Sequence, residues 1–250
     1  MPAFDPLLIM NQSQKHPPPD LPASMWAAFP PFMLLLLIAL AYVNPEMFQL
    51  MMAKDDEGGI VEHATVLILL PGIAAGFAVF IYHRQALPTP WLGWWVLMWA
   101  LACIFFAGEE ISWGQWIFEW KSPEVFRQLN SQEETNLHNI TPWLFQKPQA
   151  IVEIWILIGG LALPLWQRYK YNKWIAHPKS WQYWLFPTYV CIPAAALTLL
   201  VRFFKPFFKA VPLPHLERLG SGELREYYIA LFLCIYLLSF WLRIRKERAG

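Results

Sequence analysis

Two consecutive glutamates, Glu109 and Glu110, directly follow the apolar stretch 103–108 of this 250-residue chain. A carboxylate next to hydrocarbon is costly unless it is paired, hydrated or bound to a cation, so such a group is by default a functional candidate. The pair comes at the end of a predicted helix, where the helix dipole disfavours negative charge. Ser112 lies three residues after Glu109 and would share its helical face. Glu109, Glu110 and Ser112 are therefore candidate catalytic residues.

A second polar group lies further along the chain, at Glu134 and His138. Residues four apart share a face if the segment is helical, a geometry that suits two metal ligands or a carboxylate that orients a histidine base. The structural alternative is that Glu134 closes a capping box with Ser131. His138 is thus a candidate catalytic residue, and Glu134, His138 and Glu110 are candidate ligands of a divalent metal such as zinc. Five residues are candidates for the third zinc ligand: Glu62, His63, Glu109, Glu110 and His215.

Glu62 is a further candidate catalytic residue, because it opens an apolar stretch beside His63 and the preceding acidic residues 55–57 already supply negative charge there. Its structural alternative is an acid in the first turn of a helix, which complements the helix dipole. Three other acids are predicted to open helices in the same way: Glu153, Glu223 and Glu226. For Glu153 the dipole interpretation is the favoured one.

The amino-acid composition indicates the environment in which these acidic and histidine residues lie. Hydrophobic residues make up 57% of the chain and charged residues only 15%, whereas soluble domains carry about 25% charged residues. The aromatic share of 17% is typical of rings at a lipid and water boundary. A net charge of +1 argues against nucleic acid as a partner. The composition therefore predicts an integral membrane protein with the lipid bilayer as its main partner.

Six segments are apolar and long enough to suggest helices that cross a bilayer, which takes about 20 residues. They are Trp26–Val43, Ile60–Tyr82, Trp91–Ser112, Ala150–Trp166, Trp181–Phe204 and Tyr227–Trp241. The sequence thus predicts an all-α, polytopic membrane helix bundle of about six transmembrane helices. The three cysteines lie in apolar stretches, which is typical of small buried side chains rather than of disulfide or metal partners. They are Cys103, Cys191 and Cys234.

The domain organisation follows from these segments. Residues 1–24 are polar and proline-rich and are predicted to be a disordered cytoplasmic tail, residues 25–243 a single transmembrane domain, and residues 244–250 a basic cytoplasmic tail. Within the domain, residues 113–149 connect the third and fourth helices and are predicted to form a partly helical extracytoplasmic lid. Ser122 followed by proline is a typical helix start in this lid.

An even number of crossings places both termini on the same side of the membrane. Compact basic clusters at 168–179 and 243–248 lie next to helix ends on that side. Basic residues in short flanks of membrane helices favour the cytoplasm. The termini are therefore predicted to be cytoplasmic, and the acidic and histidine residues described above are predicted to lie near one depth on the extracytoplasmic face.

The blocks 107–115 (AGEEISWGQ) and 134–139 (ETNLHN) resemble an uncharacterised family of bacterial multi-pass inner-membrane proteins. The resemblance covers about residues 59–139 and implies a bacterial inner membrane, without an activity. The chain is more distantly similar to the ceramidase-like membrane hydrolases, whose resemblance implies Ser, Asp and several His around one zinc in a seven-helix bundle. This chain departs from them, since it has six predicted helices and no paired HxxxH.

These observations favour an extracytoplasmic Glu/His pocket under an aromatic lid. The function we expect is metal-assisted or general acid/base chemistry, by a hydrolase or transferase, on a lipid or lipid-linked substrate. One alternative is an ion- or proton-coupled transporter of small solutes, in which the same carboxylates bind and release a cation. Another is a non-catalytic membrane subunit of a larger complex, whose acids dock a partner.

Overall fold

The computed structural model describes residues 20–52, 59–129, 135, 142–171, 179–211, 213 and 215–249, which form helices and no strand. Six helical stretches within these residues are long and apolar enough to cross a membrane, so the predicted six-span, all-α fold is confirmed. The six spans are Ser24–Val43, Ile60–Ala86, Trp91–Glu110, Lys147–Lys170, Trp181–Ala210 and Gly222–Arg248.

Most spans are built from more than one element. The first three spans and their connections contain η1 (Ser24–Ala28), α2 (Phe29–Val43), α3 (Pro45–Met51), α4 (Ile60–Ala78), η2 (Val79–His83), η3 (Arg84–Ala86) and α5 (Trp91–Glu110). The lid region contains η4 (Ser112–Gly114), α6 (Gln115–Phe118) and α7 (Glu124–Leu129). The remaining spans contain α8 (Pro142–Trp155), η5 (Ile156–Ala162), α9 (Leu163–Tyr171), α10 (Trp181–Leu185), η6 (Tyr189–Cys191), α11 (Ile192–Arg202), α12 (Phe204–Ala210), η7 (Glu217–Gly220) and α13 (Gly222–Ala249).

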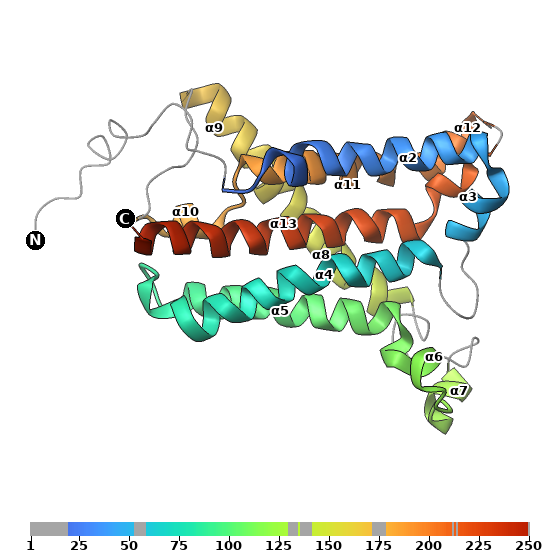
Figure 1. Cartoon of the computed structure of the whole chain (residues 1–250), viewed down its shortest axis with the longest axis horizontal. Helices are drawn as coiled ribbons and strands as arrows, with labels where there is room; N and C mark the ends of the chain where they lie inside the picture. Colours follow the sequence, from blue (N-terminus) through green and yellow to red (C-terminus); the bar gives the residue numbers. More distant parts are fainter. Residues whose placement is uncertain are drawn as a thin grey trace, which may run out of the picture.

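The helices run along a common axis, as Figure 1 shows. The start of the described chain and the end of α13 lie at one end of the bundle, which we call the terminal end. The opposite end, which we call the far end, carries α3, α6, α7 and α12 (Figure 1). This agrees with an even number of crossings, while the side that faces the cytoplasm stays a prediction.

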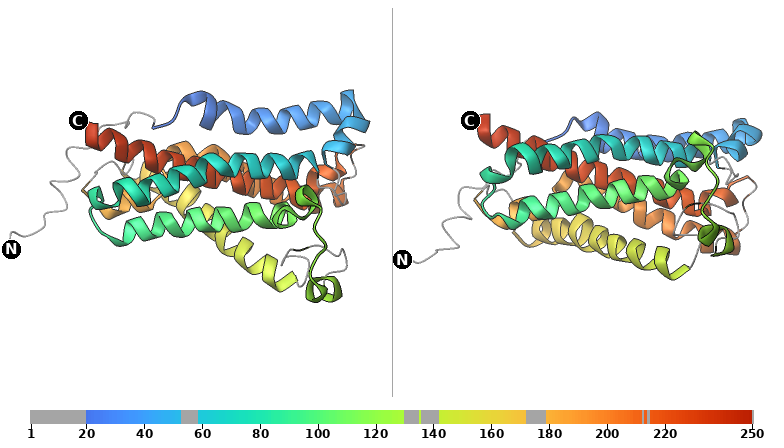
Figure 2. Two further views of the ribbon diagram at one scale, coloured as in Figure 1. Left: turned by 60° about the horizontal axis from the view of Figure 1, so that its bottom comes forward. Right: turned by 90° about the horizontal axis from the view of Figure 1, so that it is seen from below.

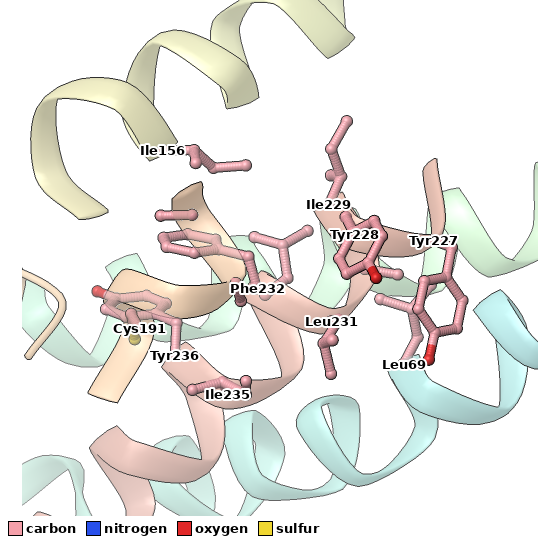
Figure 3. Close-up of a cluster of buried hydrophobic side chains, with 14 of the residues drawn as sticks. Leu69, Ile156, Cys191, Tyr227, Tyr228, Ile229, Leu231, Phe232, Ile235 and Tyr236 are labelled. Carbon is pink, nitrogen blue, oxygen red and sulfur yellow. The ribbon is translucent and has the colours of Figure 1, made fainter. Parts of the chain in front are cut away.

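α13 is the central helix of the bundle. In its most apolar 18-residue stretch 83% of the residues are buried, against 22% in the first span. It packs against α4, α5 and α11. Figure 3 shows side chains from three other elements gathered around it, namely Leu69 of α4, Ile156 of η5 and Cys191 of η6. The site described below therefore borders a well-packed helix.

Small residues let the helices approach closely, as expected where lipid removes the hydrophobic driving force for helix association. A Cβ atom built on Gly72 of α4 would lie 3.0 Å from the Cα atom of Cys234 in α13. A Cβ atom on Gly160 of η5 would lie 2.5 Å from the ring of Phe232. A larger residue at either position would force the neighbouring helix or the Phe232 ring to shift.

Tyrosine hydroxyls tie α13 to its neighbours. Tyr228 donates a hydrogen bond to the carbonyl oxygen of Pro30, at 2.9 Å, and Tyr236 donates one to the carbonyl oxygen of Leu185, at 2.7 Å. Leu185 ends α10, just before the break at Pro187, so Tyr236 satisfies a carbonyl near the chain interruption. Pro187 lacks the backbone N–H that would be needed to continue α10, so the helix is interrupted here.

Packing at the terminal end begins before residue 24. Asp20 and Leu21 are buried, and Asp20 lies 3.6 Å from the guanidinium of Arg243 while accepting hydrogen bonds from Thr188 and Ser239. The first described residues are therefore bound to the last helix. Residues 1–19 of the predicted tail lie outside the described residues. At the other boundary, α13 stays helical to Ala249, through most of the predicted basic tail.

Candidate functional site

The chain folds back on itself at the end of α5. Ser112 and Trp113 adopt positive φ angles of 46° and 55°, and Gly114 one of 84°. This turn directs the Trp113 indole to Glu109, and its Nε1–H donates a hydrogen bond of 2.8 Å to Glu109 Oε1. The ring lies over Gly108, where a Cβ atom would be 2.8 Å from it. The turn and the indole hydrogen bond thus hold the Glu109 carboxylate in place. Glu109 is buried, with an exposed fraction of only 5%.

A cavity of about 340 Å³ lies between α5, α8 and α13. Three carboxylates line it: Glu109 and Glu110 from α5, and Glu226 from α13. Its other walls are largely apolar, and no Lys, Arg or His is among the described residues that line it. The apolar lining includes Trp99, Phe105, Phe106, Val152, Ile229 and Leu233.

The polar and apolar parts of the cavity are separated along the bundle axis. Glu109 and Glu110 end α5 at the far end, and Trp99 lies about 15 Å deeper at the helical rise of 1.5 Å per residue. The cavity also reaches the lipid-facing surface, because its lining residues Leu101 and Phe105 are about half exposed. Figure 2 shows that α5 and α8 diverge towards the far end, where the carboxylates lie. The cavity is therefore accessible from the side, with its polar part at one membrane boundary.

The structure brings together only some of the predicted site residues. Glu109 and Glu110 share the cavity, whereas Ser112 is buried in the turn and is not among the residues that line it. The expected helical relation of Ser112 to Glu109 is wrong, because α5 ends before Ser112, whose φ is left-handed. A catalytic role for Ser112 stays a prediction.

Glu62 lies at the start of α4, away from the residues that line the cavity. Its Oε2 accepts a hydrogen bond of 3.0 Å from the Gly59 N–H, and His63 Nδ1 lies 2.9 Å from the Gly59 carbonyl oxygen. Both contacts satisfy backbone groups of the first helical turn. They agree with the structural alternative for Glu62, while its catalytic role stays a prediction.

Thr135 links the two sequence blocks. Its N–H donates a hydrogen bond of 2.6 Å to Gln115 Oε1, and its hydroxyl donates one of 3.0 Å to Ser122 Oγ. Glu134 and His138 lie outside the described residues. Among the residues that the structure does describe, no three His, Cys, Asp or Glu side chains are grouped as metal ligands. The metal set of Glu134, His138 and Glu110 thus stays a prediction.

The helix start predicted in the lid agrees with the structure, since α7 begins at Glu124, directly after Ser122 and its proline. Aromatic and aliphatic side chains before it are exposed, notably Phe118 and Ile117. Exposed apolar side chains at a helix end are typical of segments in the membrane interface. The lid region is therefore partly helical and has an apolar surface.

A buried ionic cluster was missed by the sequence interpretation. Glu153, with an exposed fraction of 3%, forms ion pairs with Arg202 at the end of α11 and Arg225 of α13. The first-turn interpretation of Glu153 is wrong, because α8 begins at Pro142 and Glu153 lies inside the continuous helical span that runs on through η5 and α9. Arg202 was the available signal, since an arginine inside an apolar span needs an anionic partner.

The ionic cluster and the cavity lie next to each other. Val152 lines the cavity and Glu153 belongs to the cluster, while on α13 Arg225 belongs to the cluster and Glu226 lines the cavity. Adjacent residues of a helix point about 100° apart, so the two groups occupy neighbouring faces of the same helices. For Glu226 the sequence pattern offers the helix dipole as a structural alternative and predicts the same membrane depth as for Glu109, whereas the cavity that the two residues share is visible only in the structure.

Geometry and composition together show a multi-pass membrane protein with a laterally accessible cavity that combines three carboxylates and an apolar interior. Carboxylates facing one cavity can bind a cation or transfer protons. The expected membership of an inner-membrane family stays untested. Comparison with protein-family models, curated proteins and solved structures gives no match for this chain.

Proposed function

We propose that this protein is a membrane enzyme, a hydrolase or transferase, that acts on a lipid or lipid-linked substrate by carboxylate acid/base chemistry. The observation that carries the proposal is the lipid-accessible cavity with Glu109, Glu110 and Glu226 at its polar end. Concave, mostly apolar sites with a few convergent polar groups are typical of small-molecule binding sites. The proposed location is a bacterial inner membrane, with both termini in the cytoplasm.

Glu110 and Glu226 come from different helices and line the same cavity. In the proposed mechanism, one of these carboxyl groups removes a proton from water or a substrate hydroxyl, and the other donates a proton to the leaving group. Two such groups are the minimal set for acid/base catalysis of this kind. Glu109 is the third carboxylate, and Trp113 acts as a positioning residue because its N–H fixes the Glu109 carboxylate.

His138, Glu62 and Ser112 remain part of the proposal as further catalytic residues. A divalent metal such as zinc, held by Glu134, His138 and Glu110, would supply an activated water. Metal content per chain tests this extension, measured by mass spectrometry on protein purified without metal-chelating resins. We expect near-stoichiometric metal in the wild type and its loss in both His138→Ala and Glu110→Gln. A metal-free wild type that still turns over lipid would remove the metal from the mechanism.

The alternative of an ion- or proton-coupled transporter is favoured by one observation, the charged cluster of Glu153, Arg202 and Arg225 within the spans, since intramembrane ionisable groups often mark ion pathways. Glu153, however, is already paired with two guanidinium groups. The three cavity carboxylates instead line a mostly apolar space that is large enough for a small molecule, which supports a substrate site over an ion pathway.

The experiment that tests the proposed function is a turnover assay. Purified protein in nanodiscs is incubated with a total bacterial lipid extract, and the lipids are quantified by mass spectrometry. We expect one or more lipid species to be consumed, and Glu110→Gln to lower the rate about 100-fold, the lower range of acid/base contributions. The matched control is Glu124→Gln on α7, whose carboxylate is exposed and pairs with Arg127.

Two results would overturn the proposal. The first is a wild type that changes no lipid while proteoliposomes show carboxylate-dependent solute uptake, which would establish transport. The second is lipid turnover that is the same in wild type, Glu110→Gln and Glu226→Gln, which would place the chemistry elsewhere. Thermal unfolding of each variant, monitored by circular dichroism, separates loss of chemistry from loss of fold.

A further inference from the structure

We infer that His83, Arg245 and Arg248 form a binding site for the phosphate group of an anionic phospholipid. These residues lie at the terminal end of the bundle, where α13 ends (Figure 1), whereas the cavity carboxylates lie at the far end. The inference therefore does not depend on the proposed function. Three features carry it: a contact between two spans that gathers positive charge, the lack of an acidic partner, and the position of the group at the membrane boundary.

The contact joins the end of the second span to the end of the last. η2 packs against α13, and Arg248 Nη1 lies 2.8 Å from His83 Nδ1 and 3.4 Å from the Tyr82 carbonyl oxygen. Because a guanidinium group is always protonated, it donates this hydrogen bond and the histidine Nδ1 accepts it, which leaves the proton of the neutral ring on Nε2. Arg245 is close enough to interact electrostatically with His83. The two spans thus bring three N–H donor groups together.

The two arginines form no ion pair with an acidic residue in the part of the chain that the structure describes, and both are exposed. Glu247 is the nearest acid in the sequence, but at about 100° per residue it lies roughly 160° around α13 from Arg245. It interacts instead with Tyr183 of α10. Asp20, another acid at this end, is paired with Arg243. Since like charges on neighbouring helical positions repel each other, an anion bound between the two guanidinium groups is favoured.

Aromatic rings place this group at the membrane boundary. Three spans end in the same way at the terminal end, with an aromatic ring and, four residues later, a cation that lies 4.6–5.0 Å from the ring centroid. The pairs are Phe80 and Arg84, Trp166 and Lys170, and Trp241 and Arg245. Aromatic rings gather at the lipid and water interface, and long basic side chains extend from there towards the headgroups. His83 and Arg248 therefore lie at the level of the phospholipid phosphates.

The chemistry of the group fits a phosphate. Guanidinium groups bind phosphate oxygens through parallel N–H groups, and the Nε2–H of His83 adds one more donor. The dipole of α13 accounts for basic residues at its end, but not for a histidine from another span that accepts a hydrogen bond from one of them. Basic pockets between membrane helices are typical of phospholipid headgroup sites. A phospholipid already presents its phosphate at this level, which favours the lipid over a free phosphate.

The test is lipid binding measured by native mass spectrometry. Full-length protein purified in detergent is titrated with phosphatidylglycerol and with phosphatidylethanolamine of the same acyl chains, which differ in the net charge of the headgroup. We expect the wild type to bind phosphatidylglycerol about tenfold more tightly than phosphatidylethanolamine. Glycerol 3-phosphate, the soluble phosphate probe, should not displace the bound lipid.

Variants assign this preference to the site. We expect Arg245→Gln combined with Arg248→Gln to raise the Kd for phosphatidylglycerol about tenfold, because each basic residue near the membrane surface adds to the attraction, and to leave phosphatidylethanolamine binding unchanged. The matched control combines Arg84→Gln with Lys170→Gln, which removes the same charge from the same end and should bind like the wild type. His83→Phe keeps an aromatic ring but loses the contact with Arg248, and should raise the Kd several-fold.

Three results would overturn the inference. Equal loss of binding in the two double variants would mean that only the overall surface charge attracts the lipid. Equal affinity of the wild type for the two lipids would show that the site does not select an anion. Displacement of the lipid by glycerol 3-phosphate would make a soluble phosphate the ligand. Circular dichroism confirms that each variant is folded.

The turnover assay separates this inference from the proposed function. The Arg245→Gln and Arg248→Gln double variant should keep the lipid turnover of the wild type, because the cavity lies at the other end of the bundle. A protein that binds phosphatidylglycerol through these arginines but turns over no lipid loses the proposed function and keeps this site.

Discussion

The cavity carboxylates and the Glu153 cluster are two groups of acidic residues on neighbouring faces of α8 and α13, with opposite surroundings. Glu153 is bound by Arg202 and Arg225, from two other helices. Glu109, Glu110 and Glu226 instead line a cavity with largely apolar walls, and Glu109 accepts a hydrogen bond from the Trp113 indole. The comparison shows that burial of a glutamate near the membrane does not define its role. The groups that contact the carboxylate distinguish the two sets of glutamates.

The two arrangements also have different physical consequences. The ion pairs of Glu153 join α8, α11 and α13, so the cluster acts as a cross-link between helices. A buried ion pair adds little net stability, yet removal of one partner leaves an uncompensated charge. In the proposed function, the carboxylates that line the cavity exchange protons with a bound substrate. We therefore expect mutations of the first group to change stability and mutations of the second to change activity.

The largest expected effect is on catalysis by the cavity. Glu226→Gln should lower lipid turnover about 100-fold, because a carboxamide cannot transfer the proton, while thermal stability in detergent stays close to that of the wild type. Turnover per folded protein and the unfolding temperature are measured on the same preparation. A variant that unfolds early and keeps its specific activity would contradict the comparison, since Glu226 would then act like Glu153.

The next effect is on stability. Glu153→Ala should lower the free energy of unfolding by about 3 kcal/mol, at the lower limit for breaking a buried pair because Arg202 is half exposed. The free energy of unfolding is measured in mixed micelles by titration with sodium dodecyl sulfate. Turnover of the remaining folded protein should stay within about twofold of the wild type. A stable but inactive variant would instead make Glu153 part of the catalytic site.

Trp113→Phe tests the positioning of Glu109. The substitution keeps the aromatic packing over Gly108 and removes the N–H that binds the carboxylate. A net hydrogen bond to a charged group is worth roughly 1.5 kcal/mol, so we expect about a tenfold fall in kcat with a smaller change in KM. Trp94→Phe on the exposed surface of α5 is the matched control. An unchanged kcat would show that the Glu109 orientation does not matter for the reaction.

The smallest effect is expected when the whole ionic cluster is replaced. The triple variant Glu153→Leu, Arg202→Leu and Arg225→Leu should change the free energy of unfolding by no more than about 1 kcal/mol, because apolar residues of similar volume often replace a buried ion pair without loss. Turnover should also be retained. A large destabilisation would show that the charges have a role that apolar packing cannot supply.

Part of the fold and of the candidate site could be predicted from local sequence. The six spans were correctly found because membrane insertion depends on the apolar content of about 20 consecutive residues. The helix start after Ser122 is also local, since backbone geometry at this position depends on one or two residues. Glu109 and Glu110 were recognised by their place beside an apolar stretch, and the structure places both in the cavity.

Helix limits were predicted less well. α8 begins at Pro142, ahead of the expected Ala150, and α13 begins at Gly222, ahead of Tyr227. Hydropathy marks the stretch that lies in lipid, whereas a helix continues as long as its backbone bonds can form. This shift matters for the interpretation of Glu153, because it moves this residue from the expected first turn to a position inside its helical span.

The sequence by itself determined that the chain is an all-α membrane protein with six spans, and that acidic residues gather near one end of it. Only the tertiary structure decided which of these acids share a space. Glu153 pairs with residues 49 and 72 positions away, and Glu226 meets the end of α5 across more than 110 positions. Such pairings depend on which helix faces pack together, a property of the whole bundle that local composition and spacing do not contain.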